Sequence, residues 1–290
     1  MFLLESSLIA GVISGLIFAL AGIGLIVIYR VSGYVSFAQG DIAAVALYVG
    51  LILHTAGVPY ALMALVVVLV GALVGWAVGR FLVIPFERFG ILPAAIATVG
   101  VGTAIQGGGN LVFGGESHAF PTLGEGTAMT LLSVQLSVAD VFSFGVCAFV
   151  VVVMTVGFRR TRMGIAMRAV HDNPAAARTL GLRADALKRK SWLIAGALAG
   201  LCGLFIVPVY SLTPTSVNSI LMFGFCAIVV GGLDSIVGAV VAGILIGVAS
   251  NLTAAFLSPD LVTTALFLCL TAVLLLRPQG LFGHRSVVRV

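Results

Sequence analysis

The sequence predicts an all-α polytopic membrane protein, a bundle of about eight or nine transmembrane helices with one short helix on a cytoplasmic loop. Hydrophobic residues make up 61% of the 290 residues and charged residues only 9%, whereas a soluble domain carries roughly 25% charged residues. So few charges cannot cover a soluble surface, which excludes a soluble enzyme, a disordered chain and a nucleic-acid-binding module. The apolar runs are continuous rather than alternating, which excludes a β-barrel.

Nine apolar runs are long enough, or nearly so, to cross about 30 Å of hydrocarbon. They cover residues 8–29, 35–53, 61–84, 91–113, 139–158, 191–209, 217–233, 236–257 and 261–276, with Gly, Pro and Ser at the breaks. Two of them are candidates for broken or re-entrant segments, because 217–233 is short and 35–53 contains polar residues. Such a segment is stable only where protein or a water-filled path shields its backbone.

The basic residues predict the orientation of this single transmembrane domain, residues 1–290. With nine crossings and the N-terminus outside, all 15 Lys and Arg residues fall on one side of the membrane, mostly in a loop at 159–190 and in a tail at 277–290. The loops on the other side, including the long external loop 114–138, contain none. The positive-inside rule therefore predicts a multi-pass protein with a cytoplasmic C-terminus.

Small residues recur four positions apart in several of the predicted spans. Such rows let helix backbones approach closely in a membrane, where the hydrophobic effect does not drive helices together. The sequence therefore predicts a tightly packed bundle. The rows are Gly71, Gly75 and Gly79; Gly196 and Gly200; and Ala239, Gly243 and Gly247.

The cytoplasmic loop contains a short helix signature. Asp172 or Asn173 can cap it, Pro174 suits its first position, and the three alanines that follow favour a helix. Gly181 is suited to end it in the left-handed conformation. We expect a helix over about 173–181. Two interpretations remain open: a solvated basic loop that only orients the protein, or a rigid element that a partner protein grips.

Polar residues within the spans are candidates for a solute path, because they are expensive in a membrane unless they face a cavity. Asp41 is the one acidic residue well separated from a loop end, and it either caps or hydrogen-bonds within a broken segment or lines the path. Ser36 and Gln39 share both interpretations. Gln106 and Asn110 flank three consecutive glycines, which either break the fourth helix and expose its backbone to a zwitterionic solute or simply end it.

Three separated motifs resemble the permeases of branched-chain amino acid (Liv) type ABC importers. Residues 164–203 resemble that family's RA-x-x-x-NP signature followed by a small-residue helix, and residues 277–283, RPQGLFG, match its R-P-x-G-L-F-G ending. Residues 37–41, FAQGD, resemble its N-F-A-H/Q-G-E motif, although Ser36 stands where Asn is usual and Asp41 where Glu is common. The resemblance covers essentially the whole chain, and its length is similar to that of the H-type rather than the longer M-type subunit.

The resemblance implies a non-catalytic permease subunit in the bacterial inner membrane that forms half of a path for branched-chain or other amino acids. The implied partners are a homologous M-type permease, two cytoplasmic ATPases that hold ATP and Mg, and an external solute-binding protein, besides membrane lipid. It implies no cofactor on this chain, in keeping with the lack of a G-x-x-x-x-G-K-[ST] motif, and no nucleic acid.

The resemblance also makes the loop helix a coupling helix that docks on an ATPase. Asn173 and Pro174 would start it, Ala176 and Ala177 would offer a small contact surface, and Gly181 would end it. The full set of coupling candidates is Arg168, His171, Asp172, Asn173, Pro174, Ala176, Ala177, Arg178 and Gly181. The two arginines in this set would pair with acidic groups of the ATPase.

Two other classes of protein compete with the permease. An ion- or proton-coupled secondary transporter needs intramembrane carboxylates or histidines in partnership, and Asp41 is the one plausible candidate. A membrane-embedded enzyme would need clustered His, Asp or Cys residues in the spans, and the sequence contains no such cluster.

Overall fold

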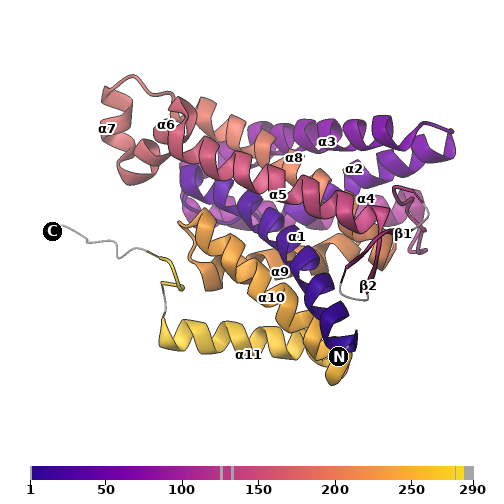
Figure 1. Ribbon diagram of the computed structural model, residues 1–290. Coiled ribbons are helices and arrows are strands. Elements are labelled where there is room, and N and C mark those ends of the chain that lie inside the picture. Colours follow the sequence, from indigo (N-terminus) through magenta and orange to yellow (C-terminus); the bar gives the residue numbers. More distant parts are fainter. Residues whose placement is uncertain (1, 125–126, 132–133, 278, 284–290) are drawn as a thin grey trace. The chain divides into compact units, whose positions relative to one another are not determined.

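The computed structural model describes the chain except for residues 1, 125–126, 132–133, 278 and 284–290. Among the described residues, six helices are long and apolar enough to cross a membrane: α1 (Phe2–Ser32), α3 (Tyr60–Ala77) with its continuation, α4 (Ile91–Phe113), α5 (Val138–Arg160), α8 (Ala184–Tyr210) and α10 (Ile236–Phe256). Three shorter apolar helices are α2 (Gln39–Thr55), α9 (Ser216–Gly231) and α11 (Leu261–Leu276). The predicted all-α multi-pass fold is confirmed, and each predicted span corresponds to one of these helices (Figure 1).

The start of α2 shows how the run 35–53 is broken. Residues 35–38 are not helical, Gly33 has a φ of 77°, and the helix begins only at Gln39. At about 1.5 Å per residue, the 17 residues of α2 measure roughly 25 Å, less than the hydrocarbon thickness of about 30 Å. The short run 217–233, by contrast, forms the continuous helix α9.

The third span continues beyond its predicted end in a changed helical form. A π-helical turn, η1 (Val78–Val83), follows α3, and a 3-10 helix, η2 (Ile84–Phe89), follows η1. Pro85 has no N–H to donate, so a regular α-helical ladder cannot pass through it. Gly79, within the π-helical turn, packs directly against the indole ring of Trp192, which leaves no room for a Cβ.

The glycine triplet of α4 neither breaks nor ends the helix, so both predictions for it were wrong. Residues 107–109 lie within α4, which ends at Phe113, followed by Gly114 with a φ of 72°. A glycine costs a helix only about 0.5–1 kcal/mol relative to alanine. Freeing a backbone group in a membrane costs several kcal/mol, so the helix continues.

The chain forms two compact units. One comprises residues 1–26, 124–152 and 222–290, and the other comprises residues 27–123 and 153–221. In the second unit, α2, α3 and α8 pack on one another. A Cβ built on Gly71 would lie 2.5 Å from the carbonyl oxygen of Gly196, and one on Gly75 would lie 2.6 Å from that of Trp192. The two predicted glycine rows therefore face each other, as close backbone approach requires.

The third row serves the same purpose in the first unit. Gly247 lies against the backbone of Gly11 and Gly15 of α1, and Gly243 lies against Ala19. Side chains at these glycines would separate α1 from α10. All three rows predicted from the sequence are thus helix contacts.

The loop 114–138 contains a hairpin that the sequence did not predict. Strand β1 (Thr127–Leu131) pairs antiparallel with β2 (Val134–Ser137), with Thr130 opposite Gln135. Two strands this short carry too little alternation to be distinguished from loop. The hairpin leads directly into α5.

Candidate substrate-path and coupling sites

A buried carboxylate joins three helices of the second unit. Asp41, in the first turn of α2, is 2% exposed. Its Oδ1 accepts a hydrogen bond of 3.0 Å from Gln106 Nε2 of α4 and another of 3.0 Å from Asn218 Nδ2 of α9. We call Asp41, Gln106 and Asn218 the Asp41 cluster. Two of the predicted path residues, Asp41 and Gln106, thus lie together, and Asn218 joins them.

Glycines allow the helices to approach the Asp41 cluster. Gly102 lies against Oδ2 of Asp41, so that even a methyl group there would overlap the carboxylate. A Cβ on Gly40 would lie 2.5 Å from Oδ1 of Asn218. Both glycines, Gly102 of α4 and Gly40 of α2, are therefore required for this arrangement.

The cluster lies away from the helix ends of α4. Gln106 is about two turns from the end of α4 at Phe113. Asp41 therefore hydrogen-bonds to the interior of the apolar helix α4 and not to its end. A charged group there is costly and typically faces a cavity or a partner group.

Ser36 and Gln39 are also buried but form no hydrogen bond with the Asp41 cluster. Gln39 Nε2 lies 3.5 Å from the carbonyl oxygen of Ala195 in α8, and its Oε1 has no hydrogen-bond partner. Ser36 Oγ is fully buried and likewise without a partner. The neighbouring backbone N–H of Phe37 donates to Thr98 Oγ1 at 3.1 Å. Two buried acceptors thus remain unsatisfied beside the non-helical start of α2.

Asn110 does not join the Asp41 cluster. Its side chain is exposed on α4, and its backbone carbonyl accepts the N–H of Gly114 at 3.0 Å. It stands four residues after Gln106 on the same helix, so the sequence spacing alone could not separate the two.

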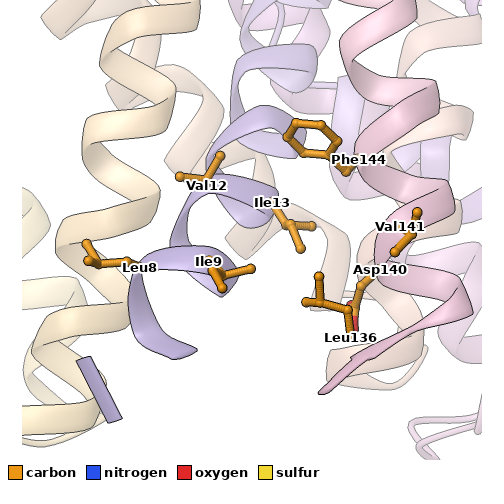
Figure 2. A pocket seen from close by; sticks show the side chains of 8 residues that line it. All are labelled: Leu8, Ile9, Val12, Ile13, Leu136, Asp140, Val141 and Phe144. Atoms are coloured by element: carbon orange, nitrogen blue, oxygen red, sulfur yellow. The ribbon is translucent and has the colours of Figure 1, made fainter. Parts of the chain in front are cut away.

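An apolar hollow of about 390 Å³ lies in the first unit between α1, β2 and α5 (Figure 2). Its lining side chains are aliphatic or aromatic, from Leu8 to Phe144, with the exception of Asp140. Both Ser137 Oγ, at 2.7 Å, and Ser137 N, at 3.1 Å, donate to Asp140 Oδ2. The one carboxylate is thus engaged within the chain, and the hollow offers little to a zwitterionic solute.

The loop 159–190 contains two helices where one was predicted. The first is α6 (Arg162–Asp172), capped by Thr161, whose Oγ1 accepts the N–H of Gly164 at 3.2 Å. Sequence reasoning missed it, although Met163, Met167 and Val170 have helical spacing.

The second helix is α7 (Pro174–Thr179), where the sequence predicted one over about 173–181. Asn173 caps it by accepting the N–H of Ala176 on Oδ1 at 3.0 Å. After α7, Gly181 adopts a φ of 79° and donates to the carbonyl of Arg178 at 3.0 Å. The start and the stop are thus the local structures that the residue types favour.

The coupling candidates differ in exposure. Arg168, Asp172, Asn173, Ala176, Arg178 and Gly181 are exposed. Ala177 is only 2% exposed and faces the chain itself, so it does not provide the contact surface expected of it. His171 is half-buried, with its ring centroid 5.9 Å from that of Tyr29. Pro174 begins α7.

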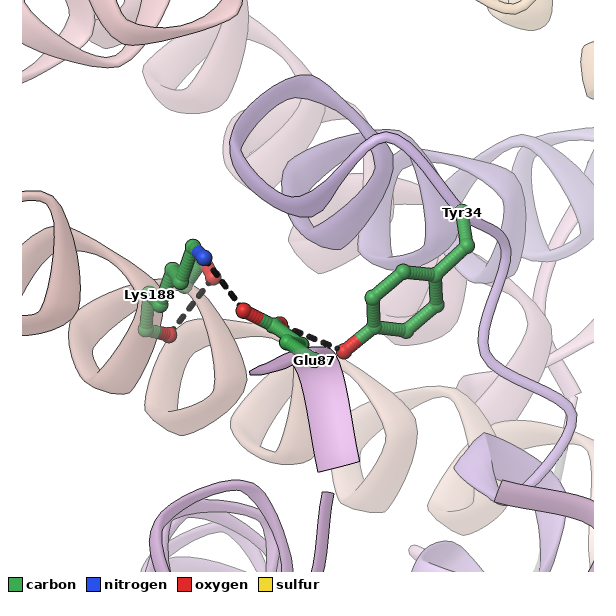
Figure 3. A network of polar contacts seen from close by, with 4 residues as sticks. Tyr34, Glu87 and Lys188 are labelled. Carbon is green, nitrogen blue, oxygen red and sulfur yellow. Dashed lines mark hydrogen bonds and ion pairs between the residues drawn. The ribbon is translucent and has the colours of Figure 1, made fainter. Parts of the chain in front are cut away.

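A polar network ties the start of α8 to the rest of the second unit (Figure 3). Lys188 Nζ pairs with Oε2 of Glu87 in η2, and Tyr34 donates its hydroxyl to Oε1 at 2.8 Å. Burial first, and then the Glu87 carboxylate, raises the pKa of the Tyr34 hydroxyl well above its usual value. The hydroxyl therefore stays protonated and acts as the donor. Only a few residues separate α7 from α8, which carries Lys188.

Comparison with known proteins decides the family. Residues 7–276 match the family described as branched-chain amino acid transport system / permease component. The chain belongs to this family of transport permeases. The permease contains, in its described residues, no group of three or more His, Cys, Asp or Glu residues that could hold a metal ion.

Named relatives of the permease match it over nearly their whole length. The high-affinity branched-chain amino acid transport system permease protein LivH of Salmonella typhimurium is 27% identical over 97% of this chain and 96% of its own length. The probable branched-chain amino acid transport permease protein LivH of Methanocaldococcus jannaschii is 30% identical over 91% of this chain and 88% of its own. Among solved structures, PsaBC from Streptococcus pneumoniae in complex with Fab matches with a TM-score of 0.47 and 12% identity, covering 95% of this chain and 91% of that one.

Sequence reasoning missed two residues of the permease that the structure brings into these sites. Asn218 stands at the start of a short apolar run, where an amide is easily taken for a helix cap. Glu87 stands beside Arg88 in a loop that was interpreted only through its basic residues. In both cases the partner is far away in the sequence, so no local pattern identifies the contact.

Proposed function

We propose that the permease forms half of the translocation path of an ATP-driven importer for branched-chain or other amino acids. A homologous M-type permease supplies the other half, and an external solute-binding protein delivers the solute. Two cytoplasmic ATPases bind ATP with Mg²⁺ and hydrolyse it, so this chain is not itself an enzyme. Family membership supports the transport role, and the names of the relatives support the class of solute.

The Asp41 cluster is the main structural support for the proposed path. An ionised carboxylate has about four acceptor positions, and the two amide donors occupy one oxygen of Asp41. The other oxygen, Oδ2, lies against Gly102, so it can attract the ammonium group of an amino acid once α4 moves away from α2. Movement of α4 or α9 relative to α2 breaks these hydrogen bonds and changes the polarity of the path.

The loop 159–190 is the proposed site of energy coupling. Helices α6 and α7 pack on each other and on α8. These contacts hold α7 in place while its other face stays exposed. The ATPase binds this face, and α8 transmits the movement of the ATPase to Lys188 and its partners. This requires the loop and the C-terminus to be cytoplasmic and the protein to lie in the bacterial inner membrane.

A secondary transporter is the competing function, because Asp41 is a buried carboxylate. Proton relays in such transporters use ionisable residues in partnership. The hydrogen-bonding side chains on Asp41, however, are the amides of Gln106 and Asn218, which do not titrate. This contact set favours the ATP-driven importer.

Reconstituted transport tests the proposal. The permease is purified with the M-type permease and ATPases from its own operon, reconstituted in liposomes with ATP inside, and given the binding protein and labelled leucine outside. Uptake should require ATP and the binding protein and should survive a protonophore. Asp41→Asn should abolish most uptake while the complex still assembles, whereas Asn110→Ala should transport normally.

Uptake that proceeds without ATP and collapses on addition of a protonophore would identify a secondary transporter. Normal uptake by the Asp41→Asn variant would remove Asp41 from the path and leave it a packing residue.

A further inference from the structure

A narrow apolar groove lies where α5 meets α6 in the second unit. Its volume is about 160 Å³. It is lined mainly by Val153, Gly157 and Phe158 of α5, Met163 and Met167 of α6, and Ile194 of α8. Methionine side chains adapt to flexible apolar partners. The groove lies beside the last turns of a membrane-spanning helix, so it is close to the lipid headgroups of one leaflet.

Three arginines each stand next in the sequence to a residue that lines this groove. Arg159 and Arg160 end α5 and Arg162 begins α6, and all three are exposed. Within the described part of the chain, none of the three forms an ion pair. The guanidinium carbon of Arg30 also lies 5.7 Å from the ring centroid of Phe158 in the groove. Three exposed arginines that form no ion pair with a described residue thus adjoin the groove-lining residues in the sequence.

We propose that this junction binds an anionic phospholipid. The phosphate lies on Arg159, Arg160 and Arg162, and part of one acyl chain lies in the groove. Guanidinium groups bind phosphate oxygens through paired hydrogen bonds, and basic pockets at the ends of membrane helices bind anionic headgroups. Because α5 is long enough to span the membrane, its terminal arginines lie at headgroup level, where such a lipid is available.

This site does not depend on the proposed transport function. It concerns the start of α6, which supports α7, and not the Asp41 cluster. A lipid held between α5 and α6 fixes the angle at which the loop 159–190 leaves the membrane.

Native mass spectrometry of the full chain in mild detergent measures the binding. The chain is titrated with phosphatidylglycerol and, separately, with phosphatidylcholine, and the bound lipids are counted. Phosphatidylglycerol should bind more tightly. The triple variant Arg159→Gln, Arg160→Gln, Arg162→Gln should bind phosphatidylglycerol about a hundredfold more weakly, because each of the three arginines contributes a similar share of the binding free energy. A triple lysine variant should retain most of the binding.

A matched charge control removes three positive charges that are not adjacent to the groove lining. The Arg178→Gln, Arg183→Gln, Lys190→Gln variant changes three exposed residues, has the same net charge as the glutamine triple variant and should bind phosphatidylglycerol like the original chain. Equal loss in the two glutamine variants would show a diffuse charge effect and overturn the proposed site.

The groove is tested by filling it without disturbing the fold. A Cβ on Gly157 meets no atom within 4 Å, and neither does one on Gly145 of the same helix, which does not line the groove. Gly157→Leu should therefore fold and displace part of the acyl chain, weakening phosphatidylglycerol binding about tenfold. Gly145→Leu should leave the binding unchanged.

Three further results would overturn the proposal. The first is equal binding of the two lipids, and the second is unchanged binding by the Gly157→Leu variant. The third is unchanged lipid binding by the Arg159, Arg160 and Arg162 glutamine variant together with loss of its ATPase, which would assign these arginines to an acidic protein surface.

Discussion

Lys188, near the start of α8, pairs with Glu87 of η2 through their charged groups. The side chains are 18% and 12% exposed, so water screens the pair only in part. Glu87 also accepts the hydroxyl hydrogen of Tyr34, which lies between α1 and α2. The three residues link the segment after α1, the segment after α3 and the first turns of α8. The start of α8 is thereby tied to η2 and to the segment between α1 and α2.

Glu87→Gln should lower the stability of the permease by about 1–3 kcal/mol, because it leaves Lys188 half-buried and unpaired. The midpoint of thermal unfolding in detergent measures the effect. The double variant Glu87→Leu, Lys188→Met removes both charges and should be less destabilised than the sum of the single variants. Strict additivity of the two substitutions would show that the pair contributes no coupling.

Gly102→Ala should disturb the Asp41 cluster, because its methyl group overlaps the carboxylate of Asp41. Overpacking of this kind costs about 1–3 kcal/mol, and displacement of Asp41 should also reduce uptake in the reconstituted complex. Gly100→Ala on the same helix is the matched control, since its methyl group meets no atom within 4 Å. It should be neutral or stabilising by up to about 1 kcal/mol. Equal effects of the two variants would show that the carboxylate tolerates the added methyl.

Much of the fold could be predicted because a membrane imposes simple rules. Continuous apolar runs define the helices, and glycines four residues apart mark close contacts such as Gly71 with Gly196. The same rules explain the error at residues 107–109. Glycine is a helix breaker mainly in water, whereas the membrane penalises the broken helix.

The candidate site was only partly predictable, since its contacts are tertiary. The cost of a buried charge identified Asp41, but which amides satisfy it depends on how α4 and α9 pack on α2. In the loop, Asn173 and Gly181 have local roles that their residue types indicate. No local rule distinguishes the exposed Ala176 from the buried Ala177, because this depends on how α7 lies against α6 and α8.

Cysteine labelling should place residues 117 and 185 on opposite sides of the membrane. Ser117 and Asp185 are both exposed, and in the nine-crossing topology the first is external and the second cytoplasmic. Cys269 is exposed and must first be replaced, whereas Cys147, Cys202 and Cys226 are buried. An impermeant maleimide should label the Ser117→Cys variant in intact cells and the Asp185→Cys variant only after lysis. Labelling of both variants in intact cells would contradict the topology.

Gly181→Val should disrupt the turn after α7, because Gly181 has a φ of 79°. A left-handed conformation costs a residue with a side chain roughly 1–2 kcal/mol, and a β-branched residue tolerates it least. Gly181→Asn is the conservative control, since asparagine commonly adopts this conformation at helix ends. ATP hydrolysis stimulated by the loaded binding protein should fall in the valine variant and persist in the asparagine variant. Equal activity of the two would show that the turn does not transmit movement.

The exposed face of α7 should be the surface that the ATPase contacts. Ala176 is exposed, so Ala176→Trp places its ring outside the chain, where it obstructs a docked partner. The overpacking should cost about 1–3 kcal/mol at the contact, which weakens assembly roughly tenfold to a hundredfold. The amount of ATPase that copurifies with the permease measures this loss.

Two control variants separate docking from folding. Ala177 is 2% exposed, so Ala177→Trp should instead disrupt the packing of the loop and lower the thermal midpoint of the permease alone. Ala176→Trp should leave that midpoint unchanged. Arg183→Trp adds an equally large ring at another exposed position of the loop and should retain the ATPase. If Ala176→Trp retains it as well, the partner does not contact this face of α7, and the loop only orients the protein in the membrane.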